Sequence, residues 1–469
     1  MADAVSLAPD FPPATEAEWR ALAGRALAGA PFESLTTQTA EGLSIAPLYA
    51  PAGHAAAPAR AVAADRPWQI GCLTAHPDPA RANREILADL QGGAAVATIR
   101  VDPTGRAGVA VGSAEGLARV LDGVILELAP VALDAGFLGP QAAQWLGAAA
   151  KASPGALLRF HLDPLSAFAE AGASPGPVAA HLSFAADTAR QLSETYPQAQ
   201  LFLASGRAVH EAGGGEALEV AFAAASAAAY ARALVESGLP MPDAFARITL
   251  GLAADVDPFL TLAKLRAARA VWARIAKACG ADPAARIDAR SSRRMLTAAD
   301  AWTNMVRLTI AAFGAAVGGA DTVVLGNFTD ALGLPTELAR RQSRNAQLVL
   351  MEEAHIGRVA DPAAGAGYVE AMTDQIARAA WSRFQAMAAA GGVIPALETG
   401  WVSREVAASI AARPASKIIG VTAFPPPDDA RPEIELAAAR TVDAPTPRLP
   451  GSDSHCPALR AIRVAEPFE

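Results

Sequence analysis

Short apolar and β-branched runs alternate along this chain with longer segments of helical period, and this alternation limits the fold more than any other feature. Such runs between turn residues are typical of buried parallel strands, whereas apolar positions that repeat every 3.6 residues are typical of helices. About eight strand–helix units follow at intervals of roughly 30 to 45 residues, which suits a (β/α)8 barrel. We therefore predict an α/β fold of the TIM-barrel type, with a doubly wound open sheet as the alternative. The strands are predicted at 69–73, 95–101, 124–128, 157–162, 200–204, 247–252, 285–290 and 322–325.

The two ends of the chain are predicted to lie outside the barrel. Residues 1–64 hold one helical stretch, 15–28, then an extended run and an Ala/Pro/Gly-rich linker at 50–64, which is too little core to fold alone. Residues 421–469 carry clustered prolines, which predict an extended belt. The domains are then a dimerisation arm with its linker (1–64), a barrel (65–420) and a Pro-rich belt (421–469). Helices are predicted at 217–237, 258–277, 298–317, 335–355, with Pro335 in the first turn, and 368–387.

Short segments that match one enzyme family follow one another in that family's order over almost the whole chain. In the arm they read FESL (32–35), EGL (41–43) and PLY (47–49); later segments are RPWQI (66–70), GVAV (108–111), LDG (121–123), SG with EAG (205–206 and 211–213), KLRAAR (264–269), LTA (296–298), LPT (334–336), RNAQ (344–347) and DP (361–362). This order resembles the adenosylcobalamin-dependent acyl-CoA mutases, and within them the small (beta), non-catalytic subunit of heterodimeric methylmalonyl-CoA mutase. The resemblance implies a TIM barrel and a partner, the large (alpha) subunit.

The reactive side chains of that family are missing at the matching positions. The resemblance places the family's tyrosine, which follows RPW-x-I, at Leu73, and the histidine of its SGYH motif at Ala208. Neither side chain can donate a hydrogen bond. His210 would share a face with Ala208 if this segment were a strand end, so it is a weak candidate to replace the lost histidine; an ordinary loop or capping histidine is the alternative. We expect no catalytic residue in this chain.

Other family features are altered in the same direction. The family's HxQTSG segment reads DARSSR at 288–293, so Arg290 and Arg293 replace a neutral lining, and NSFDEA reads GNFTDA at 326–331. The glutamine-asparagine-aspartate segment has no counterpart at 167–175. The cobalt-binding DxHxxG loop is matched only by DSHCPA (453–458), which lacks the glycine and a following βαβ pattern, so we interpret it as belt. We expect no cofactor and no flavodoxin-like cobalamin domain here, with adenosylcobalamin in the large subunit. The sequence leaves open whether the chain is naturally short or truncated.

Other kinds of site find little support in the sequence. The glycines at 92–93 and 213–215 match neither phosphate-loop pattern, and the seven histidines lack metal-ligand spacing, so we predict turns and no metal site. The residues Glu352, Glu353 and His355 are interpreted as a solvated helix face. A net charge of -8 argues against nucleic acid. We expect no membrane partner and a cytoplasmic protein, because there is neither an 18-residue apolar run nor a signal peptide, and the three cysteines form no CxxC pair.

Three functions from different classes remain open. The first is a structural subunit that supports a catalytic mutase subunit, which interconverts methylmalonyl-CoA and succinyl-CoA. The second is an acyl-CoA mutase barrel that is active with a separate cobalamin-binding subunit. The third is a barrel that binds an acyl-CoA or a regulatory partner without isomerising it. The lost tyrosine and histidine favour the first.

Two structural expectations follow from this interpretation. The barrel lumen should be filled and closed to pantetheine, by apolar side chains drawn from Leu73, Val96, Ile99, Leu158, Phe160, Leu203 and Leu250. The arm should expose apolar residues that contact the large subunit, because an extended segment cannot bury them alone. The interface candidates are Phe32, Leu35, Leu43, Ile45, Leu48 and Tyr49.

Overall fold

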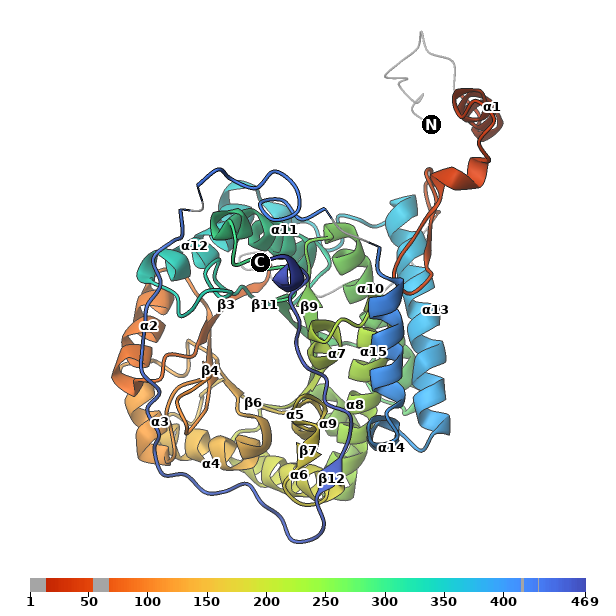
Figure 1. Ribbon diagram of the computed structural model, residues 1–469. Helices are drawn as coiled ribbons and strands as arrows, with labels where there is room; N and C mark the ends of the chain where they lie inside the picture. The colour runs from red at the N-terminus through yellow and green to blue at the C-terminus, as the bar shows by residue number, and fades with distance from the viewer. Residues whose placement is uncertain (1–13, 54–66, 415–416, 429) are drawn as a thin grey trace, which may run out of the picture.

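A closed barrel of eight parallel strands forms the centre of the computed structural model, which describes residues 14–53, 67–414, 417–428 and 430–469 (Figure 1). The strand order around the ring is β10-β11-β3-β4-β5-β6-β8-β9. Because the ring closes, the sheet has no free edge, and the open-sheet alternative is wrong. The predicted TIM barrel is confirmed. Its strands are β3 (Gln69–Thr74), β4 (Val96–Arg100), β5 (Val131–Asp134), β6 (Leu158–Leu162), β8 (Gln200–Ser205), β9 (Ile248–Ala254), β10 (Arg286–Ser291) and β11 (Thr322–Val324).

The third strand lies seven residues beyond the start of its predicted position, so the prediction of a strand at 124–128 is wrong. That apolar run forms an irregular loop in which the side chains of Ile125 and Leu128 are exposed and Leu126 is buried. The strand begins at Val131, after Pro130, because proline lacks the N–H that a strand in the barrel interior must donate. Apolar content alone did not distinguish the loop from the strand.

The helices around the barrel begin at sites that the sequence specifies. Asp78, Asp163 and Asp257 each cap a helix whose first residue is proline, and each aspartate accepts a hydrogen bond from a first-turn N–H. Thr336 caps α12, so Pro335 lies just before that helix and not in its first turn. The helices are α2 (Pro79–Gln91), α3 (Ala114–Val120), α4 (Gly139–Ala149), α5 (Pro164–Ala171), α6 (Val178–Thr195), α7 (Arg207–Glu211), α8 (Glu216–Glu236), α9 (Met241–Ala246), α10 (Pro258–Ala278), α11 (Asn304–Val317) and α12 (Glu337–Leu348).

Three further helices cover one side of the barrel. They are α13 (Gly367–Ala389), α14 (Val393–Glu398) and α15 (Trp401–Ala412), and α13 packs along α8 and α10. Within the described residues α8 is the one helix that is long and apolar enough to cross a membrane, and 78% of its apolar window is buried inside the protein. Its neutral surface is therefore accounted for by burial beneath α13, as in the core helix of a globular protein.

The last segment, residues 417–469, passes around the rim of the barrel at the C-terminal ends of the strands (Figure 1). It has little regular structure apart from β12 (Ser454–His455), which pairs with β7 (Ala173–Ser174). Its main-chain groups bond to one strand-to-helix loop after another. The belt residues Glu435, Val442, Leu449, Ile462 and Val464 donate their N–H groups to the carbonyls of Leu334, Pro103, Pro175, Glu211 and Arg294 respectively.

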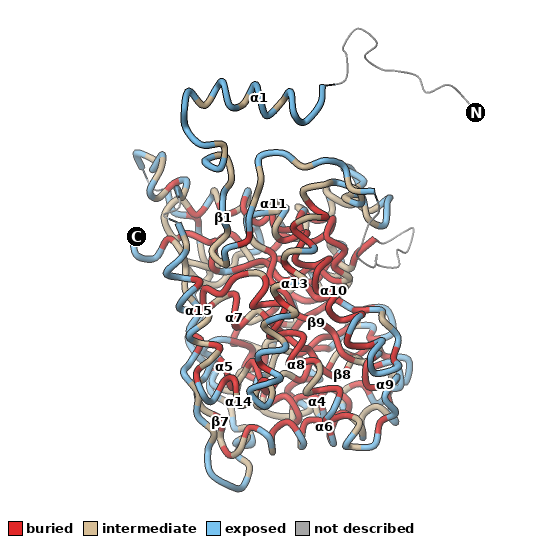
Figure 2. The backbone as a smooth tube through the Cα atoms, turned by 90° about the vertical axis from the view of Figure 1, so that its right-hand side faces the viewer, coloured by how far each residue is buried: buried red, intermediate tan, exposed pale blue. Residues whose placement is uncertain are grey.

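The N-terminal arm is anchored at one end and free at the other. It comprises α1 (Glu16–Ala26), a short 3-10 helix (Phe32–Leu35), and the paired strands β1 (Thr37–Gln38) and β2 (Ser44–Ile45). No residue of α1 is buried, and Figure 2 shows this helix standing away from the body. The linker predicted at 50–64 lies outside the described residues from 54 onward.

The anchored part of the arm corrects one expectation. Glu41 accepts hydrogen bonds from the N–H groups of Ala217 and Leu218 at the start of α8, and Leu43 is buried against the core. The Tyr49 ring packs on Tyr368 at a centroid distance of 5.4 Å. The expectation that Leu43 is exposed is therefore wrong. Phe32, Leu35 and Ile45 are half-buried, and Leu48 is 49% exposed.

Candidate functional site

The positions that the resemblance assigns to the family's tyrosine and histidine lie at the C-terminal end of the barrel. Leu73 is in β3, opposite Thr98 of β4, and Ala208 is buried in the short helix α7 that follows β8. Since residues 207–211 are helical, successive side chains turn by about 100° around the backbone. His210 consequently does not share a face with Ala208, as it would on a strand end. The geometry gives no support to His210 as a replacement.

His210 instead belongs to a buried ionic cluster. Its Nε2 lies 2.8 Å from the Ser292 hydroxyl and its Nδ1 lies 3.2 Å from the Glu219 carboxylate. Lys264 donates to the same carboxylate at 2.6 Å. Burial alone would raise the pKa of Glu219, but Lys264 and His210 outweigh it and hold the pKa at about 2. The cluster ties α7, α8, α10 and the end of β10 together.

A serine, a histidine and a glutamate lie side by side as in a hydrolytic triad, but Nδ1 of His210 makes no hydrogen bond and the cluster has no access to substrate. The side chains of His210 and Glu219 are 0% exposed, and Ser292 is also fully buried. A nucleophile must reach the scissile carbonyl, which a sealed hydroxyl cannot do. We interpret the cluster as structural. Sequence reasoning did not find it, because its members come from four distant segments.

Arginine side chains bridge the barrel lumen from one wall to the opposite wall. Arg290 of β10 donates to Asp134 of β5 at 2.8 Å, and these strands lie opposite each other in the ring. Arg159 of β6 donates to Thr322 of β11 at 2.8 Å, and these strands are also opposite. Arg159 also donates to Gln69 of β3. Contacts between opposite strands can form only through the interior, so two cross-braces occupy the lumen.

A second pair of arginines extends this network toward the strand ends. Arg100 donates through two nitrogens to Asp134 at 3.2 Å, and Arg207 donates to Asp288 at 3.1 Å. Burial alone would raise the pKa of Asp134, but Arg100 and Arg290 outweigh it and hold the pKa far below its usual range. The same balance lowers the pKa of Asp288, with Arg290 and Arg207 as the largest opposing charges. Both carboxylates are therefore ionised partners of the arginines.

Several buried polar atoms in the lumen have no hydrogen-bond partner. They include both ring nitrogens of His161, Nε and Nη2 of Arg290, and Oδ2 of Asp288. Burial lowers the pKa of His161 to about 3, although Asp288 acts in the opposite direction. His161 also has a φ of 47°, in the left-handed region that a residue with a side chain rarely adopts. The contacts that bridge the lumen thus form at a cost in strain and desolvation.

The expectation of an apolar lumen is wrong for Ile99, Leu158, Phe160 and Leu250, whereas Leu73, Val96 and Leu203 lie on the lumen face of their strands. Phe160 packs against Tyr196 at the end of α6, outside the sheet. Since side chains alternate between the two faces of a strand, its neighbours Arg159 and His161 point inward. Ile99 and Leu250 likewise occupy positions that alternate with the lumen-facing Arg100 and Gly251, and Leu158 alternates with Arg159. The sequence could not fix this strand phase, because both faces of a barrel strand are buried.

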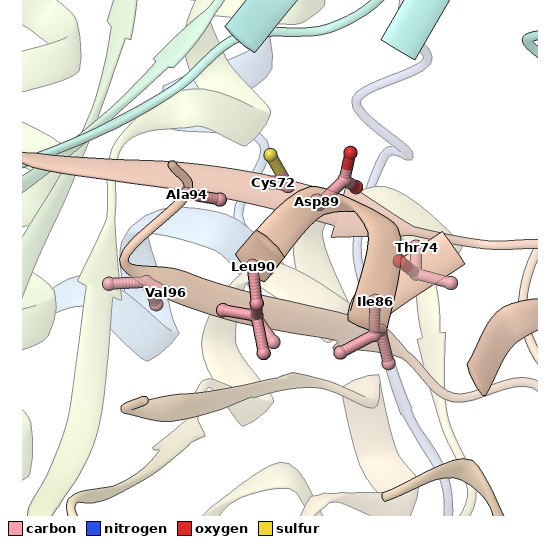
Figure 3. A pocket seen from close by; sticks show the side chains of 8 residues that line it. Cys72, Thr74, Ile86, Asp89, Leu90, Ala94 and Val96 are labelled. Atoms are coloured by element: carbon pink, nitrogen blue, oxygen red, sulfur yellow. The ribbon is translucent and has the colours of Figure 1, made fainter. Parts of the chain in front are cut away.

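One small space lies between β3, β4 and α2, beneath Cys72 and Asp89 (Figure 3). It has no room for a water molecule. Burial raises the pKa of Cys72 to about 12, with Asp89 acting in the same direction, so the thiol is un-ionised. We interpret this space as a packing defect.

No group of histidine, cysteine and acidic side chains in the described parts of the chain could hold a metal ion. Asp453, in the segment that matches the cobalt-binding loop, accepts from the Gly176 N–H, and His455 lies in β12. Both residues hold the belt against the barrel. Pro457 and Ala458 follow where the family loop continues to glycine. These residues do not fit a cobalamin ligand.

The fold defines a TIM-barrel protein whose lumen is crossed by arginine side chains. Residues 58–444 match the family described as methylmalonyl-CoA mutase. The chain belongs to this family. It is 39% identical over 457 residues to the methylmalonyl-CoA mutase small subunit of Streptomyces virginiae, covering 90% of this chain and 72% of that protein.

Two other relatives extend this comparison. A Mycobacterium tuberculosis protein described as a probable methylmalonyl-CoA mutase small subunit is 40% identical over 394 residues, covering 78% of this chain and 62% of that protein. The methylmalonyl-CoA mutase of Escherichia coli is 30% identical over 430 residues, covering 83% of this chain and 60% of the enzyme. The chain thus spans about three fifths of the length of these two relatives.

We predict that Asp134→Ala destabilises the barrel by about 2 to 3 kcal/mol, because it leaves Arg100 and Arg290 without their shared carboxylate. The estimate lies below the full penalty for a buried pair, since the Asp134 side chain is 32% exposed. Urea unfolding measures the change. The exposed carboxylate of Asp122 provides a control, and Asp122→Ala should leave stability unchanged. Equal stability of the two variants would contradict the cross-brace.

We predict that His161 makes the protein less stable as the pH falls from 6.5 toward 3. The unfolded histidine takes up a proton near pH 6.5, whereas the folded one does so near pH 3, so acid favours the unfolded state. The slope is at most about 1.4 kcal/mol per pH unit. Unfolding of wild type and His161→Asn at pH 7, 6, 5 and 4 measures it, since asparagine tolerates a left-handed φ. The stability of the variant relative to the wild type should rise at each step down in pH. Equal pH dependence of the two stabilities would refute the prediction.

Proposed function

We propose that this chain is the non-catalytic small subunit of a heterodimeric methylmalonyl-CoA mutase. The large subunit would carry adenosylcobalamin and interconvert methylmalonyl-CoA and succinyl-CoA, and this chain would support it in the cytoplasm. The observation that carries the proposal is the contact between Arg290 and Asp134 across the barrel. Similarity to proteins named as small subunits supports it independently.

The cross-braces explain why an acyl-CoA would not enter this barrel. A pantetheine chain along the axis would have to part Arg290 from Asp134 and Arg159 from Thr322. Arg290 and Asp134 would then be separated charges, at a cost of several kcal/mol for a buried ion, and Arg159 would lose its hydrogen bond to Thr322. An uncharged pantetheine offers no compensating charge. The barrel without a bound acyl-CoA is therefore more stable than the barrel with a pantetheine chain in its lumen.

The residues at the mouth of the barrel also lack the means to perform the reaction. Leu73 and Ala208 cannot donate a hydrogen bond to a thioester oxygen, and electrostatic stabilisation of a reacting group needs positioned donors. Arg207, which stands where the family motif has its tyrosine, donates to Asp288 instead. This chain's own groups therefore serve packing and charge pairing. The alternative, a barrel active with a separate cobalamin-binding subunit, requires that these pairs open.

We predict that the isolated chain with adenosylcobalamin forms no succinyl-CoA from methylmalonyl-CoA above the control without protein. The double substitution Leu73→Tyr with Ala208→His should not change this result, because catalytic groups act as a unit and the lumen would still be bridged. Chromatographic assay of succinyl-CoA over time checks both proteins. The large subunit, assayed with this chain added, is the positive control. Turnover by the isolated wild type would refute the proposal in favour of the alternative.

We predict that deleting residues 14–36 weakens association with the large subunit and leaves the barrel folded. This segment contains α1 and the short 3-10 helix, whose side chains are exposed or half-buried in the isolated chain. Residues 41–49 are retained because they pack on the barrel's own helices. Co-elution with the large subunit measures association, and circular dichroism measures folding. A folded truncated chain that co-elutes as well as the wild type would show that the arm is not a main contact.

A further inference from the structure

Helix α11 presents an uncharged outer face to solvent. Trp302, just before the helix, and Val306 and Phe313 within it are 39%, 59% and 37% exposed, and Ile310 between them is half-buried. These positions recur at helical spacing, so they form one line along the helix. Arg307 is the one charged residue between Asn304 and Val317, and it is buried. We call these four apolar side chains the α11 stripe.

Other barrel helices show what an outer face looks like when it meets water. Arg84 on α2, Asp187 on α6 and Arg274 on α10 are exposed charged residues. Two helices are exceptions. α8 has no charged residue over 220–231 and is covered by α13, whereas α4 has none over Gly139–Ala149 but exposes only the polar Gln144 and the small Ala148. An exposed line of large apolar side chains therefore distinguishes α11 from both. The α11 stripe has the composition of a covered face but stays exposed in the isolated chain.

The α11 stripe is continuous with the root of the arm. A side chain at Gly314, next to Phe313, would lie 3.1 Å from Pro258, the first residue of α10. The next residue, Phe259, is 51% exposed and packs edge-on against Tyr368, the ring that also holds Tyr49 of the arm. Figures 1 and 2 both place α11 at the end of the body from which the arm rises. The apolar surface thus leads from α11 toward the root of the arm, past the exposed acidic residue Asp257 that caps α10.

We propose that the α11 stripe is the second contact surface of this chain for the large subunit, which covers it with an apolar, uncharged helical surface. The inference rests on the proposed function, because it takes the large subunit as the partner of the arm. The chain's own α1 does not cover the stripe, since none of its residues is buried. A contact continuous with the arm root would extend one interface instead of creating a separate one. Apolar patches of this kind are typical of subunit interfaces.

The test compares two charge-introducing variants of the full-length chain for binding to the large subunit. Val306→Asp with Phe313→Asp places two charges in the stripe, whereas Leu128→Asp places one on an exposed leucine in the loop before β5. Calorimetric titration measures the dissociation constants. The stripe variant should bind at least about tenfold more weakly, and the Leu128 variant should bind within about twofold of the wild type. Unfolding curves of the free proteins confirm that each variant is folded.

The outcomes separate this inference from the proposed function. If the wild type binds and the stripe variant binds equally well, the stripe is not a contact and the proposed function stands. If the wild type does not bind the large subunit, both are overturned. Should the stripe variant not fold, hydrogen exchange of the wild-type complex decides: α11 amides exchange more slowly than in the free chain if the stripe is covered, and at the same rate if it is not. Self-association of the wild type that is abolished by the stripe variant would assign the stripe to a second copy and overturn the inference.

Discussion

The contact between Arg290 and Asp134 determines what the barrel can contain. It joins opposite walls near the C-terminal ends of the strands, where barrel enzymes bind their substrates. Arg100 and Arg207 bind the same two carboxyl groups, so the contact across the lumen belongs to a larger network of charges. The closed state is itself strained, since His161 adopts a left-handed conformation and both its nitrogens lack partners. A lumen of this kind is suited to supporting a barrel and unsuited to threading an uncharged chain.

The surface of the molecule is consistent with this structural role. The belt bonds to the strand-to-helix loops one after another, and α13 covers the uncharged middle of α8. Both devices stabilise the barrel without using its interior. Among the described residues, the helix α1 and the outer face of α11 expose their side chains. They lie at the same end of the body, which is where a partner would have to supply the missing contacts (Figure 2).

The sequence predicted the barrel and seven of its strands, because periodicity and turn residues are local signals. It misplaced the third strand, where an apolar loop precedes Pro130. It placed Leu73 and Ala208 where the resembling family has its tyrosine and histidine, because recognisable motifs lie beside both positions, and this assignment stays a prediction. It could not predict a charged lumen, since which face of a buried strand points inward depends on the register of the whole ring. The same limit hid the cluster around His210, whose partners lie on α8, α10 and the end of β10.

Titration of the isolated chain with methylmalonyl-CoA tests most directly whether the lumen is closed to an acyl-CoA. Calorimetry on the wild type should show no saturable binding. The Asp134→Ala variant is informative as a comparison, because it removes one end of the cross-brace and leaves the length of the barrel unchanged. Saturable binding of methylmalonyl-CoA by the wild type, reduced by competition with free CoA, would contradict the account and show that the barrel opens to admit the pantetheine chain.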